Sequence, residues 1–194
     1  MKNYCCAFLL VLLLFGCSSE GLDKCQVNLS LSDEAFNKIQ KKRDEALTTG
    51  HLFKNKTDYV SVELSIGEDV IPVRLRLKGD EIDHLEGENW SFRIKSKNKK
   101  VLGHRKFSLQ QPSTKNYVWE YLFHSMCKKE GIAALDYGFL PVSMQGGKPV
   151  TYAFESIADN YSLTSAGKEL GPILRFDENA YWKKFMEGHR DLDS

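Results

Sequence analysis

The residues best suited to chemistry in this 194-residue chain are basic side chains that recur along one predicted strand. In the segment 91–96, Arg93 and Lys95 fall on one face and Phe92 and Ile94 on the other, because side chains alternate along a strand. Phosphoryl transfer depends on positioning and on cations that hold phosphate groups. Arg93 or Lys95 is therefore a candidate for gripping a phosphate. A solvated basic strand face explains the same pattern, so both interpretations stay open.

Two further positions could support such a site. Lys78 and Gly79 end the strand before it, and a glycine there would let the backbone approach a phosphate closely. An ordinary turn accounts for them equally well. Glu120 lies on a predicted helix, where it could hold one of the two strand cations in place. Its neighbour at i+4, His124, is the alternative partner.

The elements that would position these residues follow from periodicity. A helix is predicted over 32–50, with Ser32 as its N-cap and Gly50 after its end. A second helix over 113–131 carries an apolar stripe at helical spacing, which predicts packing against a sheet. Alternation predicts two hairpins and two further strands, over residues 59–79, 90–96, 106–110 and 139–155. We therefore expect an α+β domain, a mostly antiparallel sheet with one packed helix.

This order of elements resembles the small lobe of a protein kinase. In that lobe, the second hairpin leads into the hinge, where backbone groups meet adenine. The resemblance places Glu155 and Ile157 at the hinge.

Several segments together resemble the CotH-type spore-coat kinase family, over about residues 70–185. They are VRLRLKGD, the stretch from WSFRIK to CKKEGI, the hairpin ending in Glu155, and GPILRFDENAYW. The chain departs from the family pattern in the second hairpin. Gln145 replaces an asparagine there, and Val150 or Thr151 stands where a second glycine is usual.

The resemblance implies an atypical protein kinase that uses ATP and a divalent metal, Mg²⁺, to phosphorylate serines in surface proteins. It implies a nucleotide site built from the residues named above, namely Lys78, Gly79, Arg93, Lys95, Glu120, Glu155 and Ile157. The family's metal-binding acids lie in a helical large lobe beyond this sequence. We therefore expect an incomplete kinase domain that is inactive alone, and no catalytic or metal-binding residue is assigned.

The N-terminus predicts export. A single basic residue and an apolar run too short to span a roughly 30 Å bilayer core precede Leu14-Phe15-Gly16-Cys17, which resembles a bacterial lipobox. We expect a lipid on Cys17 and attachment to the cell envelope; a plain signal peptide is the alternative. The expected organisation is a signal peptide, a tether, a leading helix, a kinase-like small lobe, and a following helix with the start of a large lobe, over residues 1–16, 17–30, 31–50, 51–157 and 158–194.

Overall composition limits the other function classes. The net charge is +1 with interspersed charges, which argues against nucleic acid as a partner. The five histidines show no metal-ligand spacing. Two alternatives to the kinase remain: a noncatalytic surface lipoprotein that binds a protein or carbohydrate partner, and a structural module unrelated to ATP.

Overall fold

Alternating apolar residues form the strands that make up the centre of the fold. The computed structural model describes residues 26–165, 167–174, 182–185 and 187–188. Its strands are β1 (Val27–Ser30), β2 (Val60–Ile66), β3 (Asp69–Leu77), β4 (Phe92–Ser96), β5 (Lys106–Gln110), β6 (Tyr137–Met144) and β7 (Val150–Ser156). The hairpin β2–β3 and the strands β4 and β5 lie where the alternation predicted them.

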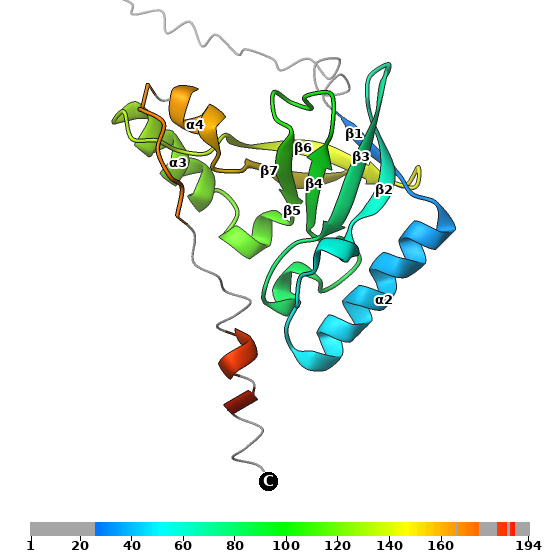
Figure 1. The fold of residues 1–194 in the computed structure, drawn as a ribbon. Coiled ribbons are helices and arrows are strands. Elements are labelled where there is room, and N and C mark those ends of the chain that lie inside the picture. Colours follow the sequence, from blue (N-terminus) through cyan, green and yellow to red (C-terminus); the bar gives the residue numbers. More distant parts are fainter. Residues whose placement is uncertain (1–25, 166, 175–181, 186, 189–194) are drawn as a thin grey trace, which may run out of the picture.

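These strands close into a barrel in the order β1-β2-β3-β4-β5-β7-β6 (Figure 1). All neighbouring strands pair antiparallel except β1 and β6, which pair in parallel with Val27 opposite Val142. The expectation of an α+β layer resembling a kinase small lobe is therefore wrong. An open sheet was predicted, and the β1–β6 pairing closes it.

Strand β1 lies inside the stretch 17–30 that the sequence analysis assigned to a tether. It has four residues, too few for alternation to distinguish a strand from a linker. Its two apolar side chains nevertheless point into the core, with Val27 0% and Leu29 1% exposed. This short segment closes the barrel by pairing with β6.

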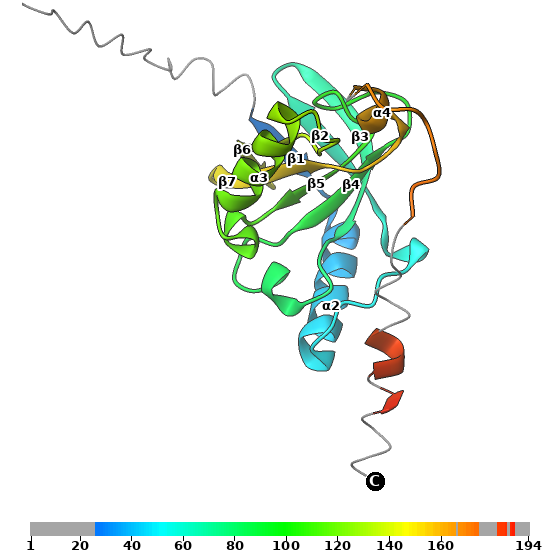
Figure 2. The same cartoon turned by 90° about the vertical axis from the view of Figure 1, so that its left-hand side faces the viewer.

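The interior is filled by the inward side chains of the strands, among them Leu75, Ile94, Phe107 and Leu109. Helix α2 (Asp33–Thr49) lies against one end of the barrel in both views (Figures 1 and 2). The helix begins and ends as predicted: the Ser32 hydroxyl accepts a hydrogen bond from the Ala35 amide at 3.2 Å, and Gly50 adopts φ 73°. Its buried side chains are Ala35, Ile39 and Ala46.

Helix α3 (Trp119–Lys129) is oriented opposite to expectation. The predicted packing stripe consists of Val118, Tyr121, Leu122, Ser125 and Met126, and all five side chains are exposed. The residue of this helix that is buried is His124, whose ring stacks on Tyr137 of β6 with centroids 5.8 Å apart. A helix packed on the sheet through its apolar stripe is thus also a wrong prediction, because the helix contacts the barrel through its polar side.

Short helices complete the described part of the chain: η1 (Lys56–Asp58), η2 (Ile82–His84), η3 (Pro112–Lys115) and α4 (Asn160–Ser165). No helix among the described residues has the length and apolar character needed to cross a membrane. The connections that contain η2 and η3 matter most for function, because both lie beside the ends of β3 and β5 and carry charged side chains.

Because the apolar side of α3 is exposed, we expect substitutions there to change the free energy of unfolding little. Leu122→Gln and Phe123→Gln should each change the free energy of unfolding by less than about 0.5 kcal/mol, as surface substitutions usually do. Leu75→Ala, in the barrel interior, should cost about 2–5 kcal/mol. Urea unfolding of the three variants measures both effects. A loss above about 2 kcal/mol in either α3 variant would contradict the exposed stripe.

Candidate functional site

A row of outward side chains crosses the barrel wall from strand to strand. Strand register places Arg76 of β3 beside Arg93 of β4, then Ser108 of β5, Glu155 of β7 and Tyr137 of β6. Alternation makes this the outer face, because the apolar residues on either side in each strand point inward. The row brings together charged residues from segments more than 60 positions apart in sequence.

Glu155, a member of this row, forms a buried ion pair with Lys78. Lys78, the residue after β3, donates from Nζ to Glu155 Oε2 at 2.6 Å, and the two side chains are only 12% and 16% exposed. Lys78 Nζ also donates to the Gln110 side-chain oxygen at the end of β5. Its backbone amide bonds the Ser91 carbonyl at 2.8 Å, which fixes where the side chain starts. One lysine thus links the ends of three strands.

Two further cations act on this pair. Burial lowers the pKa of Lys78, and the neighbouring charges of Arg93 and Lys115 lower it further against the attraction of Glu155. Burial alone would raise the pKa of Glu155, but Lys78, Arg93 and Lys115 together hold it below its ordinary value. Three cations therefore surround one carboxylate. Such a cluster, which we call the Lys78–Glu155 site, favours an added anion.

The wall beneath the site contains a polar atom whose hydrogen-bonding capacity is not used. Ser108 and Gln110 are fully buried. The Gln110 side chain bonds Lys78 and Tyr137, whereas Ser108 Oγ has no hydrogen-bond partner within the described part of the chain. Buried polar groups in native proteins are nearly always bonded to protein or to ordered water. Ser108 lies opposite Glu155, where a polar ligand or water could satisfy its hydroxyl.

Gly79 follows Lys78 and is held tightly by the loop that contains η2. It adopts φ +114°, and a Cβ built on it would lie 2.6 Å from the Cβ of His84. His84 in turn contacts the Ser91 hydroxyl through Nδ1 at 3.0 Å. The sequence analysis interpreted Gly79 as part of a phosphate-facing turn, and the structure shows that its missing side chain makes room for His84.

Burial, followed by the charge of Lys78, lowers the pKa of His84 to about 4. The folded state therefore keeps this imidazole neutral at pH values where the unfolded chain, with a histidine pKa of about 6.5, already binds a proton. Stability that is fully present above pH 6.5 should be lost as the pH falls toward 4.

The measurement is a comparison of urea midpoints at pH 7.5 and 4.5 for the native chain and His84→Gln. Acidic groups such as Glu155 and Asp136, whose pKa values are also lowered, will contribute to the loss in both proteins. The native chain should lose more stability than the variant over this interval. Equal losses would mean that His84 does not titrate as its surroundings require.

The structure places the two predicted phosphate-binding residues, Arg93 and Lys95, on different parts of the outer face. Arg93 shares the outer face with Glu155, one strand beyond Ser108, and its charge acts on both members of the ion pair. Lys95 is on the same face but one row away, with its Nζ 4.3 Å from the centroid of the Tyr59 ring. The outer face thus brings Arg93 to the site and Lys95 to another surface.

Glu120 takes the alternative partner that the sequence allowed. Its carboxylate lies 3.5 Å from His124 Nε2, and no ion pair between described residues joins it to Arg93 or Lys95. Its charge nevertheless acts on Tyr137, at the β6 end of the row. Burial raises the pKa of Tyr137 to about 12; a hydrogen bond with Gln110 opposes this shift, and the charges of Glu120 and Glu155 add to it.

Ile157, the other predicted hinge residue, follows the end of β7 and is half-buried. Gln145, which departs from the family pattern, serves the backbone: its side chain accepts from the Leu31 amide at 3.1 Å and donates to the Leu31 carbonyl at 2.7 Å. It therefore fastens the β6–β7 turn to the residue that follows β1.

Sequence reasoning missed three members of the site. Gln110 and Tyr137 fall on strands whose pairing could not be inferred, and Lys115 lies on a short turn of helix, η3. Their polarity at positions next to apolar runs was the available signal. It becomes informative only when the strand order β5-β7-β6 is known.

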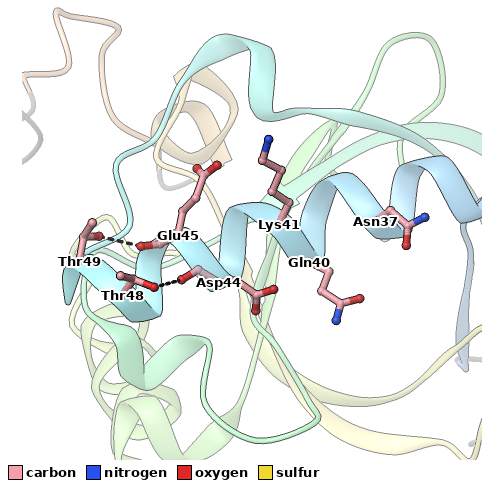
Figure 3. A pocket seen from close by; sticks show the side chains of 7 residues that line it. All are labelled: Asn37, Gln40, Lys41, Asp44, Glu45, Thr48 and Thr49. Atoms are coloured by element: carbon pink, nitrogen blue, oxygen red, sulfur yellow. Dashed lines mark hydrogen bonds between the residues drawn. The ribbon is translucent and has the colours of Figure 1, made fainter.

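A surface hollow elsewhere on the molecule lacks such chemistry. The described residues that line it are side chains of α2, namely Asn37, Gln40, Lys41, Asp44, Glu45, Thr48 and Thr49 (Figure 3). Two of its hydroxyls, on Thr48 and Thr49, bond carbonyls of their own helix. These side chains spread along one helix and do not converge, so we place the functional site at the buried Lys78–Glu155 pair.

Comparisons with known proteins give no family assignment. No model of a protein family matches the chain, and no curated protein matches it. Within the described ranges, no group of three or more histidine, cysteine, aspartate or glutamate side chains is arranged to hold a metal ion. The functional argument therefore depends on the site's own chemistry.

Proposed function

We propose that this domain binds the phosphate groups of a nucleotide at the Lys78–Glu155 site, and that ATP is the nucleotide. The observation that carries the proposal is the convergence of three cations on a buried carboxylate: Arg93 and Lys115 act on the Lys78–Glu155 pair. A phosphate group bound there would raise the lowered pKa of Lys78 toward its ordinary value. ATP is chosen because the resemblance to CotH-type kinases implies it.

The resemblance also implies a reaction, transfer of phosphate to serines of surface proteins. The described residues do not offer a set of ligands for Mg²⁺, so our proposal is limited to nucleotide binding by these side chains. Arg93 and Lys115 would meet the phosphates, Lys78 would be held in place by Glu155, and the unused hydroxyl of Ser108 would bond an oxygen of the ligand.

Isothermal titration with ATP, ADP and pyrophosphate tests the proposal. Arg93→Gln and Lys115→Gln should each weaken binding about ten- to hundredfold, because a charge-assisted hydrogen bond contributes about 1.5–3 kcal/mol. Lys99→Gln is the matched control, since Lys99 is exposed and pairs with Asp69 away from the site. No binding of any of the three ligands, or equal weakening by the control, would contradict nucleotide binding here.

Noncatalytic binding of a protein or carbohydrate partner is the second candidate function. The outward apolar stripe of α3 favours it, because contiguous exposed apolar surface on a protein commonly marks an interaction site. The titration with ATP separates the two candidates. A domain that binds no nucleotide would keep only this second function.

We further propose that the chain is exported and anchored to the bacterial envelope by lipid on Cys17, a residue outside the described part of the structure. The support is the short apolar run that ends in Leu-Phe-Gly-Cys. Mass spectrometry of protein expressed from its own start codon in a bacterial host should find a lipid-modified Cys17 at the mature N-terminus. Cys17→Ser should abolish the modification, and retention of Met1 in the native chain would contradict it.

A further inference from the structure

A second basic surface lies one step from the Lys78–Glu155 site on the same barrel wall. We call it the basic strip and define it as Arg74 and Arg76 of β3, Lys95 of β4 and Lys106 of β5. Strand register places Arg74 opposite Lys95 and Lys95 opposite Lys106. Arg74, Lys95 and Lys106 are exposed, whereas Arg76 is half-buried.

The like charges of the basic strip reduce the stability of the sheet. Like charges directly opposite each other on neighbouring strands destabilise a sheet. The strip contains two such pairs in a single row across three strands. In addition, no carboxylate among the residues that the structure describes pairs with any of its four cations. A sequence selected for stability alone would place an acid in this row.

Tyr59, immediately before β2, organises the strip. Its ring centroid lies 5.3 Å from the Arg74 guanidinium carbon, 5.4 Å from that of Arg76 and 4.3 Å from Lys95 Nζ. Each such contact is worth about 0.5–1 kcal/mol at an exposed site. Arg76 is fixed further by donating to the Leu77 carbonyl at 2.7 Å. One aromatic ring therefore holds three cations together before any ligand arrives.

We propose that the basic strip binds a short acidic segment of a polypeptide. The charges it presents have no balancing partner in the fold, and the ring reduces the entropy lost when they engage a ligand. Because neighbouring strands are about 4.8 Å apart, the row across β3, β4 and β5 spans about 10 Å. Alternate residues of an extended peptide are about 7 Å apart, so two or three carboxylates match that length.

The size of the strip favours a peptide over nucleic acid. Proteins that bind duplex DNA commonly neutralise about 6–10 phosphates, whereas the strip has four cations and the chain a net charge of only +1. A short acidic segment needs no more charges than are present. The inference does not rest on nucleotide binding, because none of the four cations is among those that act on Glu155, namely Lys78, Arg93 and Lys115.

Fluorescence anisotropy with a labelled octapeptide of alternating aspartate and serine tests this inference. Arg74→Gln and Lys95→Gln should each weaken binding about two- to fivefold, as exposed ion pairs contribute about 0.2–1 kcal/mol, and the double variant about tenfold. The matched control is Lys41→Gln/Lys148→Gln, which removes the same charge from α2 and the β6–β7 turn. It should leave binding unchanged within about twofold.

Tyr59→Leu separates positioning from charge, since it removes the ring and changes no charge. It should weaken peptide binding at least about twofold while all four cations remain. Circular dichroism and thermal melting establish that each variant is folded. Two comparison ligands, tripolyphosphate and a short single-stranded DNA of equal charge, identify the chemical class.

Binding of the acidic peptide that is lost in the strip variants and kept in the control supports the inference. Tighter binding of tripolyphosphate or DNA than of the peptide would overturn the assignment to a polypeptide. Equal weakening by the Lys41/Lys148 control would show that only net charge matters, and would also overturn it. An octapeptide with asparagine in place of each aspartate carries no carboxylates and should not bind.

Discussion

Lys78→Met is expected to lower the free energy of unfolding by about 3–5 kcal/mol, the cost of leaving a buried charge without its partner. Glu155, whose side chain is 16% exposed, would then face Arg93 and Lys115 without the 2.6 Å hydrogen bond from Lys78. The amide oxygen of Gln110 would also lose its donor. Urea unfolding at pH 7, where the carboxylate is charged, measures the loss.

 

The double variant Lys78→Met/Glu155→Leu provides the control. Replacing both members of a buried ion pair by apolar residues is often close to neutral, whereas removing one is strongly destabilising. The double variant should therefore lose less stability than the sum of Lys78→Met and Glu155→Leu, with a coupling of about 0.5–3 kcal/mol. Additive losses would show that Lys78 and Glu155 stabilise the fold separately and that the pair is not the centre of the site.

Local sequence pattern was sufficient to predict elements that depend on residues close together in the chain. Alternation in 59–79 with a glycine turn predicted the β2–β3 hairpin, and the Ser32 cap with Gly50 predicted the ends of α2. These signals depend on residues within a few positions of one another. The closure of the barrel depends instead on β1 meeting β6, segments more than 100 positions apart, and no local pattern encodes that pairing.

The orientation of α3 shows a second limit of periodicity. The helical spacing of Val118, Tyr121, Leu122 and Met126 establishes that the helix has an apolar side, but not which way that side faces. The contact of His124 with Tyr137 directs the polar side toward the barrel. A helix is expected to bury its apolar face, and that expectation failed here because the barrel already fills its own interior.

The sequence identified several residues of the candidate site, but not how they contact one another. Lys78 and Glu155 were both named from sequence, one for a turn and the other for a hinge, without any indication that they pair. Their separation of 77 positions explains why. The pairing follows from the order of four strands, β3-β4-β5-β7, which places the end of β3 and the end of β7 on one wall.

Gly79→Ala is expected to destabilise the domain by about 2–6 kcal/mol, through two effects that add. The residue has φ +114°, a conformation that costs a non-glycine residue about 1–3 kcal/mol. The new Cβ would also lie 2.6 Å from His84 Cβ, and such overpacking costs about 1–3 kcal/mol more. Because Lys78 is the preceding residue, the shift needed to relieve the clash would also move the ion pair.

Gly103→Ala separates the two effects. Gly103 also has a positive φ, +82°, but a Cβ there would meet no atom within 4 Å, so only the backbone term applies. It should cost about 1 kcal/mol, and the difference between the two variants then measures the contact with His84. Urea unfolding gives both values, and titration with ATP at a temperature where both variants are folded tests the effect on the site. If the two substitutions cost the same, His84 does not press on Gly79, and the close approach that shapes this end of the site is not present in solution.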